Sequence, residues 1–254
     1  MTSPEIIIRA DAATLNAEAA RRWTEIAAAA SAARGRFTVA LSGGSTPRAL
    51  YQLLATPEWR DRTPWPATHL FWGDERHVAP DHADSNYRMA REALIDHVAL
   101  PPANIHRMKG EMADASLAAT EYEEELRRVF QLSDGEPPRF DLILLGLGND
   151  GHTASLFPGT EALAETKLLV AAQWVEKLAT TRLTLTYPVI NAAGVVMFLV
   201  SGAEKAETLR EILEGDAPVT QYPAKGVQPA AGELLWLIDR GAGSHLKIRQ
   251  DEQD

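Results

Sequence analysis

The sequence predicts an α/β fold that is Rossmann-like, with a mostly parallel central sheet and helices on both faces. Apolar runs of strand length alternate with helix-like amphipathic stretches almost to the end of the chain. Runs such as LILLG and VVMFLV are apolar throughout, as is typical of strands covered on both faces. Strands that alternate with helices join as parallel neighbours through right-handed crossovers.

Nine short strands are expected along the chain. They cover Glu5–Arg9, Phe37–Leu41, His69–Trp72, Ile105–Met108, Asp141–Leu145, Leu168–Ala172, Arg182–Thr186, Val195–Val200 and Leu234–Ile238. Helices are expected over Asp11–Arg34, Pro47–Leu54, Ser85–His97, Ala115–Val129, Tyr187–Ala192 and Ala203–Glu214. Asp11 is the expected N-cap of the first helix and Gly35 follows its last residue, while Thr46 and Pro47 predict a cap and a first-turn proline.

Length and composition predict an ordinary globular protein. The chain has 254 residues, of which 45% are hydrophobic and 24% charged, and it contains no cysteine. Its proline-rich joints, at 64–66, 101–102 and 137–138, are only turn-sized, so we expect a single domain over residues 1–254. The absence of cysteine excludes disulfides, thiolate metal sites and a cysteine nucleophile.

The charge balance limits the partners of the protein. There are 25 basic and 35 acidic residues, a net charge of −10, which argues against binding to nucleic acid or to an anionic membrane. No signal-peptide pattern opens the sequence, and its most apolar stretch, Ala192–Val200, is about half the length of a ~20-residue membrane span. We therefore expect a soluble, cytoplasmic protein. No sequence feature fixes the oligomeric state, and a monomer is our expectation.

Ligands bind at the carboxyl ends of the strands in an open parallel sheet, so the loops that follow strands are the places to look for chemistry. The first such loop, SGGSTP, combines two glycines with hydroxyl donors at the start of a helix, which is typical of a phosphate cradle. The alternative is a plain glycine–serine turn before a capped helix. The candidate phosphate-binding residues are Ser42, Gly43, Gly44, Ser45 and Thr46.

The second loop, GDERHVAPDH, follows the expected strand that ends at Trp72. Arg76 could bind an anion there and Asp74 could take or steer a proton, although a solvated charge cluster is the alternative for either residue alone. His77 and His82 lie in the same loop, but their local spacing suggests no third ligand. We therefore expect no metal site.

The third loop matches GxGxxG at Gly146, Gly148 and Gly151, a pattern of dinucleotide-binding sites. We reject a nucleotide-dependent oxidoreductase, because Asp150 would face a pyrophosphate and Pro158 cuts the following helix short. A glycine loop that carries Asp150 and His152 suits acid–base chemistry better, because a histidine pKa lies close to neutral pH and a carboxylate can orient the ring. His152 is therefore the candidate general base.

Two further cations could supply local positive charge in this acidic chain. Arg182 begins an expected strand, and Lys205 lies in the first turn of an expected helix. A lysine in that position opposes the helix dipole, which suggests a compensating anion. An exposed lysine without any ligand is the alternative.

Taken together, these loops resemble the glucosamine-6-phosphate isomerase/6-phosphogluconolactonase superfamily and, within it, the 6-phosphogluconolactonases. The resemblance covers nearly the whole chain, and DGHTASLFPG is its most specific part. The matching segments are SGGSTP at 42–47, GDER at 73–76, SN at 85–86, GLGNDGHTASLFPG at 146–159, RLTLT at 182–186, SGAEK at 201–205 and LLWLID at 234–239.

The resemblance implies a Rossmann-like fold and hydrolysis of 6-phospho-D-glucono-1,5-lactone in the oxidative pentose phosphate pathway, with a phosphorylated sugar lactone as the partner and with no cofactor or metal. His152 would be the general base, Asp150 its orienting or proton-handling partner, and Arg76 would bind the phosphate or the lactone oxygen. The resemblance implies that the phosphate and substrate are held by Ser42, Gly43, Gly44, Ser45, Thr46, Asn86, Arg182 and Lys205.

Two other activities remain as alternatives. A glucosamine-6-phosphate deaminase would carry a glutamate five residues after the motif histidine, where this sequence has Phe157. Asp74 matches the base of those deaminases, and its role here is open. A non-catalytic sugar-phosphate sensor would need only the phosphate-binding residues, so Arg76, Asp150 and His152 together argue for an enzyme.

Overall fold

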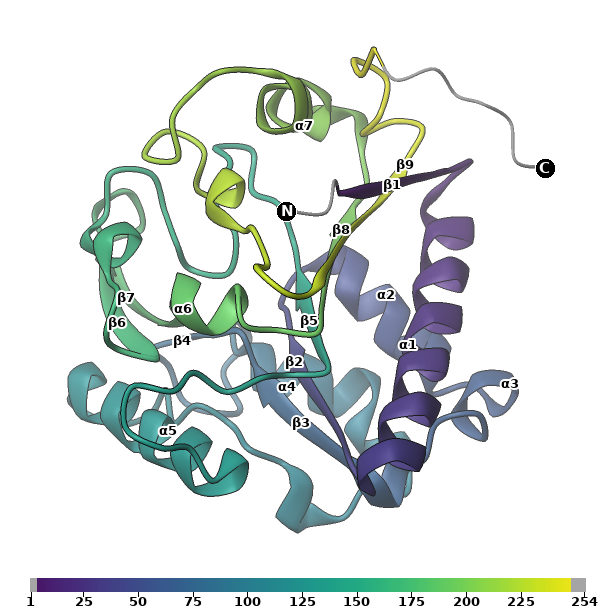
Figure 1. Ribbon diagram of the computed structural model, residues 1–254, viewed down its shortest axis with the longest axis vertical. Helices are drawn as coiled ribbons and strands as arrows, with labels where there is room; N and C mark the ends of the chain where they lie inside the picture. Colours follow the sequence, from purple (N-terminus) through teal and green to yellow (C-terminus); the bar gives the residue numbers. More distant parts are fainter. Residues whose placement is uncertain (1–3, 248–254) are drawn as a thin grey trace.

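The computed structural model describes residues 4–247 and centres on a six-stranded sheet (Figure 1). Its strands are β1 (Glu5–Arg9), β2 (Phe37–Leu41), β3 (Thr68–Trp72), β5 (Leu142–Leu145), β8 (Val195–Val200) and β9 (Glu233–Asp239). They lie in the order β1-β9-β8-β5-β2-β3, and all neighbours are parallel. The predicted α/β fold with a parallel central sheet is confirmed.

A second, three-stranded antiparallel sheet lies beside the first and was not predicted. In it β4 (Asp74–Arg76) pairs with β7 (Thr180–Leu185), which pairs with β6 (Val170–Val175). Gly73 joins the two sheets, because its N–H donates to the C=O of Leu41 and its C=O accepts from the N–H of Leu185. The chain therefore leaves β3 directly into the second sheet, without an intervening helix.

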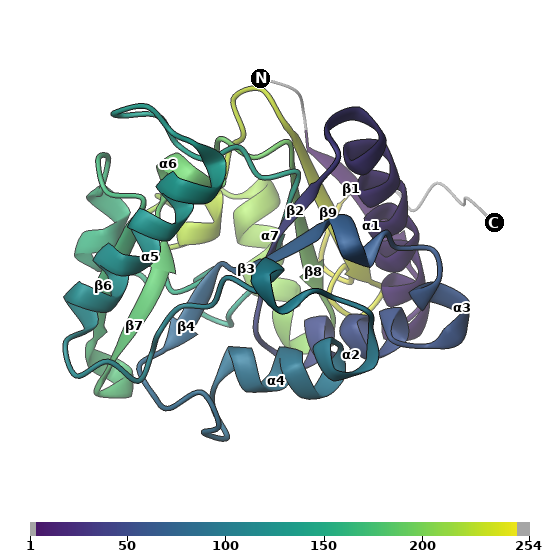
Figure 2. The ribbon, with the colours of Figure 1, turned by 90° about the horizontal axis from the view of Figure 1, so that it is seen from below.

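Helices and the small sheet cover the two faces of the parallel sheet. The helices are α1 (Ala12–Arg34), α2 (Ser45–Leu54), α3 (Pro57–Arg60), α4 (Asn86–Ala93), α5 (Ala115–Phe130), α6 (Tyr187–Ile190) and α7 (Ala206–Glu214). Figures 1 and 2 show α1 and α2 on one side of the sheet, with α6, α7 and the small sheet on the other. α5 packs on the small sheet, against β6 and β7.

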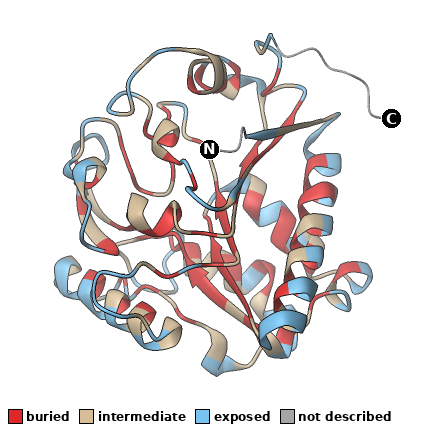
Figure 3. Ribbon diagram, in the orientation of Figure 1, coloured by how far each residue is buried: buried red, intermediate tan, exposed pale blue. Residues whose placement is uncertain are grey.

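The core lies between these layers. Strands β2 and β5 are buried along their whole length, which explains their uniformly apolar sequences (Figure 3). Trp23 of α1 packs edge-on against Phe37 of β2, with ring centroids 5.5 Å apart. Within residues 4–247, no helix has both the length and the apolar content needed to cross a bilayer.

Local sequence signals set the ends of the first helix. The Asp11 side chain accepts a hydrogen bond from the N–H of Thr14 at 2.8 Å, and the Thr14 hydroxyl accepts one from the N–H of Asp11 at 3.2 Å. Gly35 ends the helix in the left-handed conformation, with φ of 71°, and donates to the C=O of Ser31 at 2.8 Å. Both predicted end signals are confirmed.

Several predicted boundaries are wrong. Segment 105–108 is not a strand, because it meets β3 only through the single bridge between Leu70 and Ile105. The predicted helix over 85–97 ends at Ala93, and a separate 3₁₀ turn follows at Ile95–His97. The predicted helix over 203–214 begins with a 3₁₀ turn at Ala203–Lys205, so Lys205 is the residue before α7.

Candidate active site

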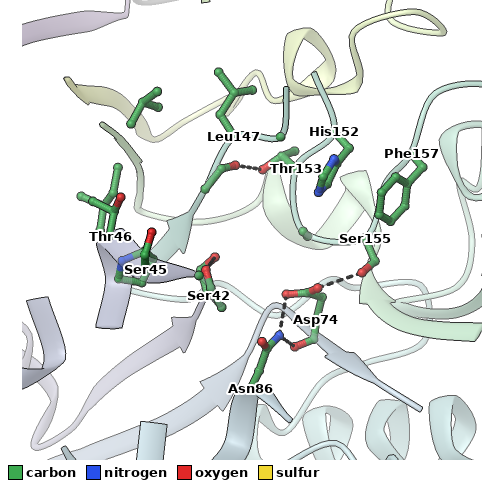
Figure 4. A pocket seen from close by; sticks show the side chains of 18 of the residues that line it. Ser42, Ser45, Thr46, Asp74, Asn86, Leu147, His152, Thr153, Ser155 and Phe157 are labelled. Atoms are coloured by element: carbon green, nitrogen blue, oxygen red, sulfur yellow. Dashed lines mark hydrogen bonds between the residues drawn. The ribbon is translucent and has the colours of Figure 1, made fainter. Parts of the chain in front are cut away.

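A cavity of about 450 Å³ lies where the carboxyl ends of β2, β3, β5 and β8 meet. These four strands are neighbours in the sheet, so the loops that follow them converge there. Figure 4 shows the side chains of Ser42, Asp74 and His152 around this space, with Phe157 beside His152. All the predicted site residues line the cavity except Asp150. Asp150 instead contacts the ring of His152, which is a lining residue.

The loop after β2 forms the rim that was predicted to bind phosphate. Helix α2 begins at Ser45, two residues earlier than expected, with Gly44 as its N-cap at φ of 107° and with no capping side chain. The predicted cap at Thr46 is therefore wrong. Among residues 4–247, the N–H groups of Ser45 and Thr46 have no hydrogen-bond acceptor, so this helix start presents free donors to the cavity.

Asn86 packs directly on that rim. A Cβ on Gly43 would lie 2.0 Å from Oδ1 of Asn86, so only glycine allows this approach. The Asn86 amide donates to the C=O of Asp74 at 2.9 Å and to its Oδ1 at 3.2 Å. Asn86 thus contacts both the Ser42–Thr46 loop and Asp74 on β4.

Asp74 and Glu75 have different surroundings. Oδ2 of Asp74 accepts from the buried hydroxyl of Ser155 at 2.8 Å, and its side chain faces the cavity (Figure 4). Glu75 points away from the cavity and accepts from the N–H groups of Asn86 and Tyr87, at 2.7 and 2.8 Å. Burial raises the pKa of Glu75. Glu75 therefore holds the start of α4, and Asp74 is the carboxylate available to a ligand.

The glycine loop after β5 brings Asp150 and His152 together. Nδ1 of His152 lies 2.5 Å from Oδ1 of Asp150, and the backbone N–H of His152 donates to the same oxygen at 3.2 Å. An ionised carboxylate only accepts hydrogen bonds, so Nδ1 carries the proton and Nε2 keeps a lone pair. A Cβ on Gly148 would lie 2.0 Å from Nδ1 of His152, so this pairing requires glycine.

The surroundings of His152 favour its neutral form. Its pKa is lowered to about 4, chiefly by burial and also by the nearby positive charges of Lys205, Arg182 and Arg76, while the charge of Asp74 opposes this shift. The ring stacks on Phe157, with centroids 4.1 Å apart. A neutral imidazole that is oriented by a carboxylate can accept a proton at Nε2.

Four cationic side chains and two carboxylates line the cavity. The cations are Arg76, Lys177, Arg182 and Lys205, and the carboxylates are Asp74 and Glu204. Burial, together with the charge of Arg76, lowers the pKa of Arg182. The cavity therefore has a positive balance of side-chain charge in a chain whose net charge is −10.

Ser155, Glu204 and Lys177 line the cavity and were not among the predicted site residues. Ser155 lies within the motif DGHTASLFPG, but its buried bond to Asp74 depends on tertiary packing. Glu204 neighbours Lys205 and carried no separate signal. Lys177 comes from the turn between β6 and β7, which the strand-end rule for parallel sheets does not cover.

A family model described as glucosamine-6-phosphate isomerases/6-phosphogluconolactonase matches residues 10–236. The chain belongs to this family. A 6-phosphogluconolactonase of Synechocystis sp. is 52% identical over 216 residues, which cover 85% of this chain and 87% of that protein. A 6-phosphogluconolactonase of Mycobacterium tuberculosis is 38% identical over 252 residues, which cover 96% of this chain and 99% of that protein. The resemblance inferred from the loop motifs is thereby confirmed.

Solved structures of the family share the fold. The 6-phosphogluconolactonase from Trypanosoma brucei superposes with a TM-score of 0.85 at 31% sequence identity, covering 97% of this chain and 100% of that one. A monomeric glucosamine-6-phosphate deaminase superposes with a TM-score of 0.78 at 21% identity, covering 95% of this chain and 100% of that one. At that identity the deaminase shows only that the two branches have a common fold.

Proposed function

We propose that this chain hydrolyses 6-phospho-D-glucono-1,5-lactone to 6-phospho-D-gluconate, a step of the oxidative pentose phosphate pathway. The observation that carries the proposal is the 2.5 Å contact between His152 and Asp150 at the wall of a cationic cavity. The 6-phosphogluconolactonases named above, at 52% and 38% identity, support the same activity.

In the proposed reaction, Nε2 of His152 removes a proton from water as the water oxygen attacks the carbonyl carbon of the lactone. The carbonyl oxygen becomes an oxyanion in the tetrahedral intermediate. Collapse of this intermediate breaks the bond to the ring oxygen, which takes the proton back from the imidazolium as it becomes a hydroxyl. The new carboxyl group then releases its proton to water, which gives the gluconate. Asp150 keeps Nδ1 protonated and stabilises the transient imidazolium.

The cations supply the remaining stabilisation. We assign the phosphate to the free N–H groups at the start of α2, with the Ser42–Thr46 loop, Arg182 and Lys205 around it. Arg76 binds either the phosphate or the oxyanion, and the effect of Arg76→Ala on product binding or on kcat distinguishes the two roles. Holding the phosphate positions the distant carbonyl against the water, which lowers the barrier to its attack.

Phe157 favours the lactonase over the deaminase branch. Its ring stacks on His152 at the position where the deaminase pattern has a glutamate. An apolar ring cannot transfer protons, and it shields one face of the imidazole from water. Ester hydrolysis needs one base and no second proton carrier at this place.

The test is hydrolysis of freshly generated lactone, measured against its spontaneous opening. We expect wild-type protein to accelerate the reaction and His152→Ala to lower kcat on the order of 10²–10⁴-fold, the range for a general base. His245→Ala is the matched control, because His245 is an exposed histidine that contacts Glu207. Binding of 6-phosphogluconate should change little in His152→Ala.

The other outcomes are equally informative. Acceleration that persists in His152→Ala moves the search for the base to Asp74 or Asp150. Binding of phosphorylated ligands without any turnover by wild-type protein supports the sensor alternative. Release of ammonia from glucosamine 6-phosphate would indicate the deaminase activity.

We also propose that residues 1–254 form one domain, and that the protein acts as a monomer in the cytoplasm. The hydrogen bonds of Gly73 to both sheets support the single domain, because the candidate site needs residues from each sheet. Analytical ultracentrifugation tests the monomer.

A further inference from the structure

Lys177 reaches the candidate site from outside the parallel sheet. It lies in the 3₁₀ turn Glu176–Leu178, which joins β6 to β7 in the antiparallel sheet. Its side chain is half exposed, at 50%, and it lines the cavity together with its neighbour Leu178. None of the segments that carry the family resemblance includes it.

The Lys177 ammonium contacts both groups that hold the imidazole of His152. Nζ forms an ion pair with Oδ2 of Asp150, whose Oδ1 receives the His152 hydrogen bond at 2.5 Å. Nζ also lies 4.7 Å from the ring centroid of Phe157, which stacks on His152 at 4.1 Å with planes 24° apart. Lys177 thus restrains both Asp150, which contacts the edge of the His152 ring, and Phe157, which stacks on its face.

We propose that Lys177 is a positioning residue for His152, acting through Asp150 and Phe157. The effect of Lys177 on kcat rests on the proposed lactone hydrolysis, whereas its effect on the position and protonation of His152 does not. The ion pair restrains Oδ2 of Asp150, so Oδ1 keeps its contact with Nδ1 of His152. The cation–π contact holds Phe157 against one face of the imidazole. Without the ammonium, both partners gain freedom and Nε2 loses its fixed direction into the cavity.

The charge of Lys177 has a second effect. Asp150 by itself favours the protonated imidazole, because opposite charges attract. An ammonium on the far oxygen offsets part of that attraction, which favours the neutral ring that can act as a base. Removal of the ammonium should therefore make His152 easier to protonate while making its orientation poorer.

The kinetic test compares Lys177→Met with Lys177→Arg. Methionine keeps the length and loses the charge, so we expect kcat to fall on the order of tenfold, with KM changed by less than about threefold. Arginine keeps the ion pair and the cation–π contact, so it should restore most of kcat. Lys167→Met is the matched control, because Lys167 is exposed on the segment that precedes β6.

A titration separates positioning from substrate contact. NMR of the His152 imidazole in the unliganded protein should show its protonation midpoint moved upward by about 0.5–1 pH unit in Lys177→Met. A large rise in KM with an unchanged midpoint would overturn the proposal and make Lys177 a substrate ligand. The titration needs no turnover, so it decides the role of Lys177 even if the chain proves not to hydrolyse the lactone.

Discussion

Arg76 and Arg182 lie directly opposite each other on the antiparallel strands β4 and β7. Side chains at such facing positions point to the same side of a sheet, and like charges there repel each other. Among residues 4–247, neither guanidinium has a carboxylate within ion-pairing distance, and Arg76 instead donates to the C=O of Asp84. A bound anion between them would remove this repulsion.

Arg182→Met should weaken the binding of 6-phosphogluconate about 10–100-fold, or about 1.4–2.8 kcal/mol, by the loss of a charge-assisted contact. The Tm of the unliganded variant should equal or exceed that of wild type, because the facing charge is gone. Calorimetric titration and thermal unfolding measure the two effects. Arg60→Met is the control, because the Arg60 side chain, at the end of α3, is exposed. Unchanged affinity in Arg182→Met would show that Arg182 does not bind the ligand.

The lowered pKa of His152 predicts the acid side of the activity profile. The imidazole acts as a base only when neutral, and its pKa is about 4. We therefore expect kcat/KM to stay nearly level from about pH 8 to pH 5, and to fall below that. A midpoint near the ordinary histidine value of about 6.5 would contradict the described environment of the ring.

The same pKa predicts a dependence of stability on pH. Between about pH 6.5 and pH 4 the unfolded chain binds a proton at His152 that the native protein does not, so the free energy of unfolding decreases as the pH falls through this window. Above it, the contribution vanishes. Urea unfolding at pH 7 and pH 5 measures this. The free energy of unfolding should decrease less between the two pH values in His152→Asn than in wild type. His245→Asn, which changes an exposed histidine, is the control.

Gly148→Ala should impair the site more than the fold. The added Cβ would meet Nδ1 of His152 at 2.0 Å and Oδ1 of Asp150 at 2.7 Å, so the pair must separate. We expect kcat to fall on the order of 10²-fold and stability by about 1–3 kcal/mol. Gly146→Ala, in the same loop, meets nothing closer than 3.7 Å and should unfold like wild type. Normal turnover in Gly148→Ala would show that the observed pairing is not needed.

Glu75→Ala should destabilise the protein by about 3–5 kcal/mol, because buried N–H groups lose their acceptor. The carboxylate accepts from the backbone of Arg76, Asn86 and Tyr87, and also from the Ser85 hydroxyl. Chemical denaturation measures the loss. Glu92→Ala, which removes an exposed carboxylate later on α4, should leave the free energy of unfolding nearly unchanged. Equal effects of the two substitutions would disprove the supporting role of Glu75.

The sequence predicts the parallel sheet well because its strands are buried on both faces. The predicted bounds of β1, β2 and β8 coincide with the observed ones. Strand β4 escaped prediction because Asp74, Glu75 and Arg76 carry no apolar pattern, and their pairing depends on β7, about a hundred residues later. The small sheet therefore arises from tertiary contacts that local patterns do not reveal.

The candidate site follows the same division. The loops after β2, β3, β5 and β8 could be predicted, because the carboxyl ends of neighbouring parallel strands share one edge. Lys177 could not be predicted in this way, because it lies in the turn of an antiparallel hairpin. Its contact with Asp150 depends on the tertiary fold. The start of α2 was misplaced because Pro47 is favourable anywhere in a first turn, so it does not mark the first helical residue.

Gly73 bonds with its N–H to one sheet and with its C=O to the other. The start of α2 follows β2 of the parallel sheet. Asp74, Arg76 and Arg182 lie on strands of the antiparallel sheet. The two hydrogen bonds of Gly73 therefore couple the sheets at the edge of the cavity. A change that loosened them would shift Asp74, Arg76 and Arg182 as a group relative to the loop at the start of α2.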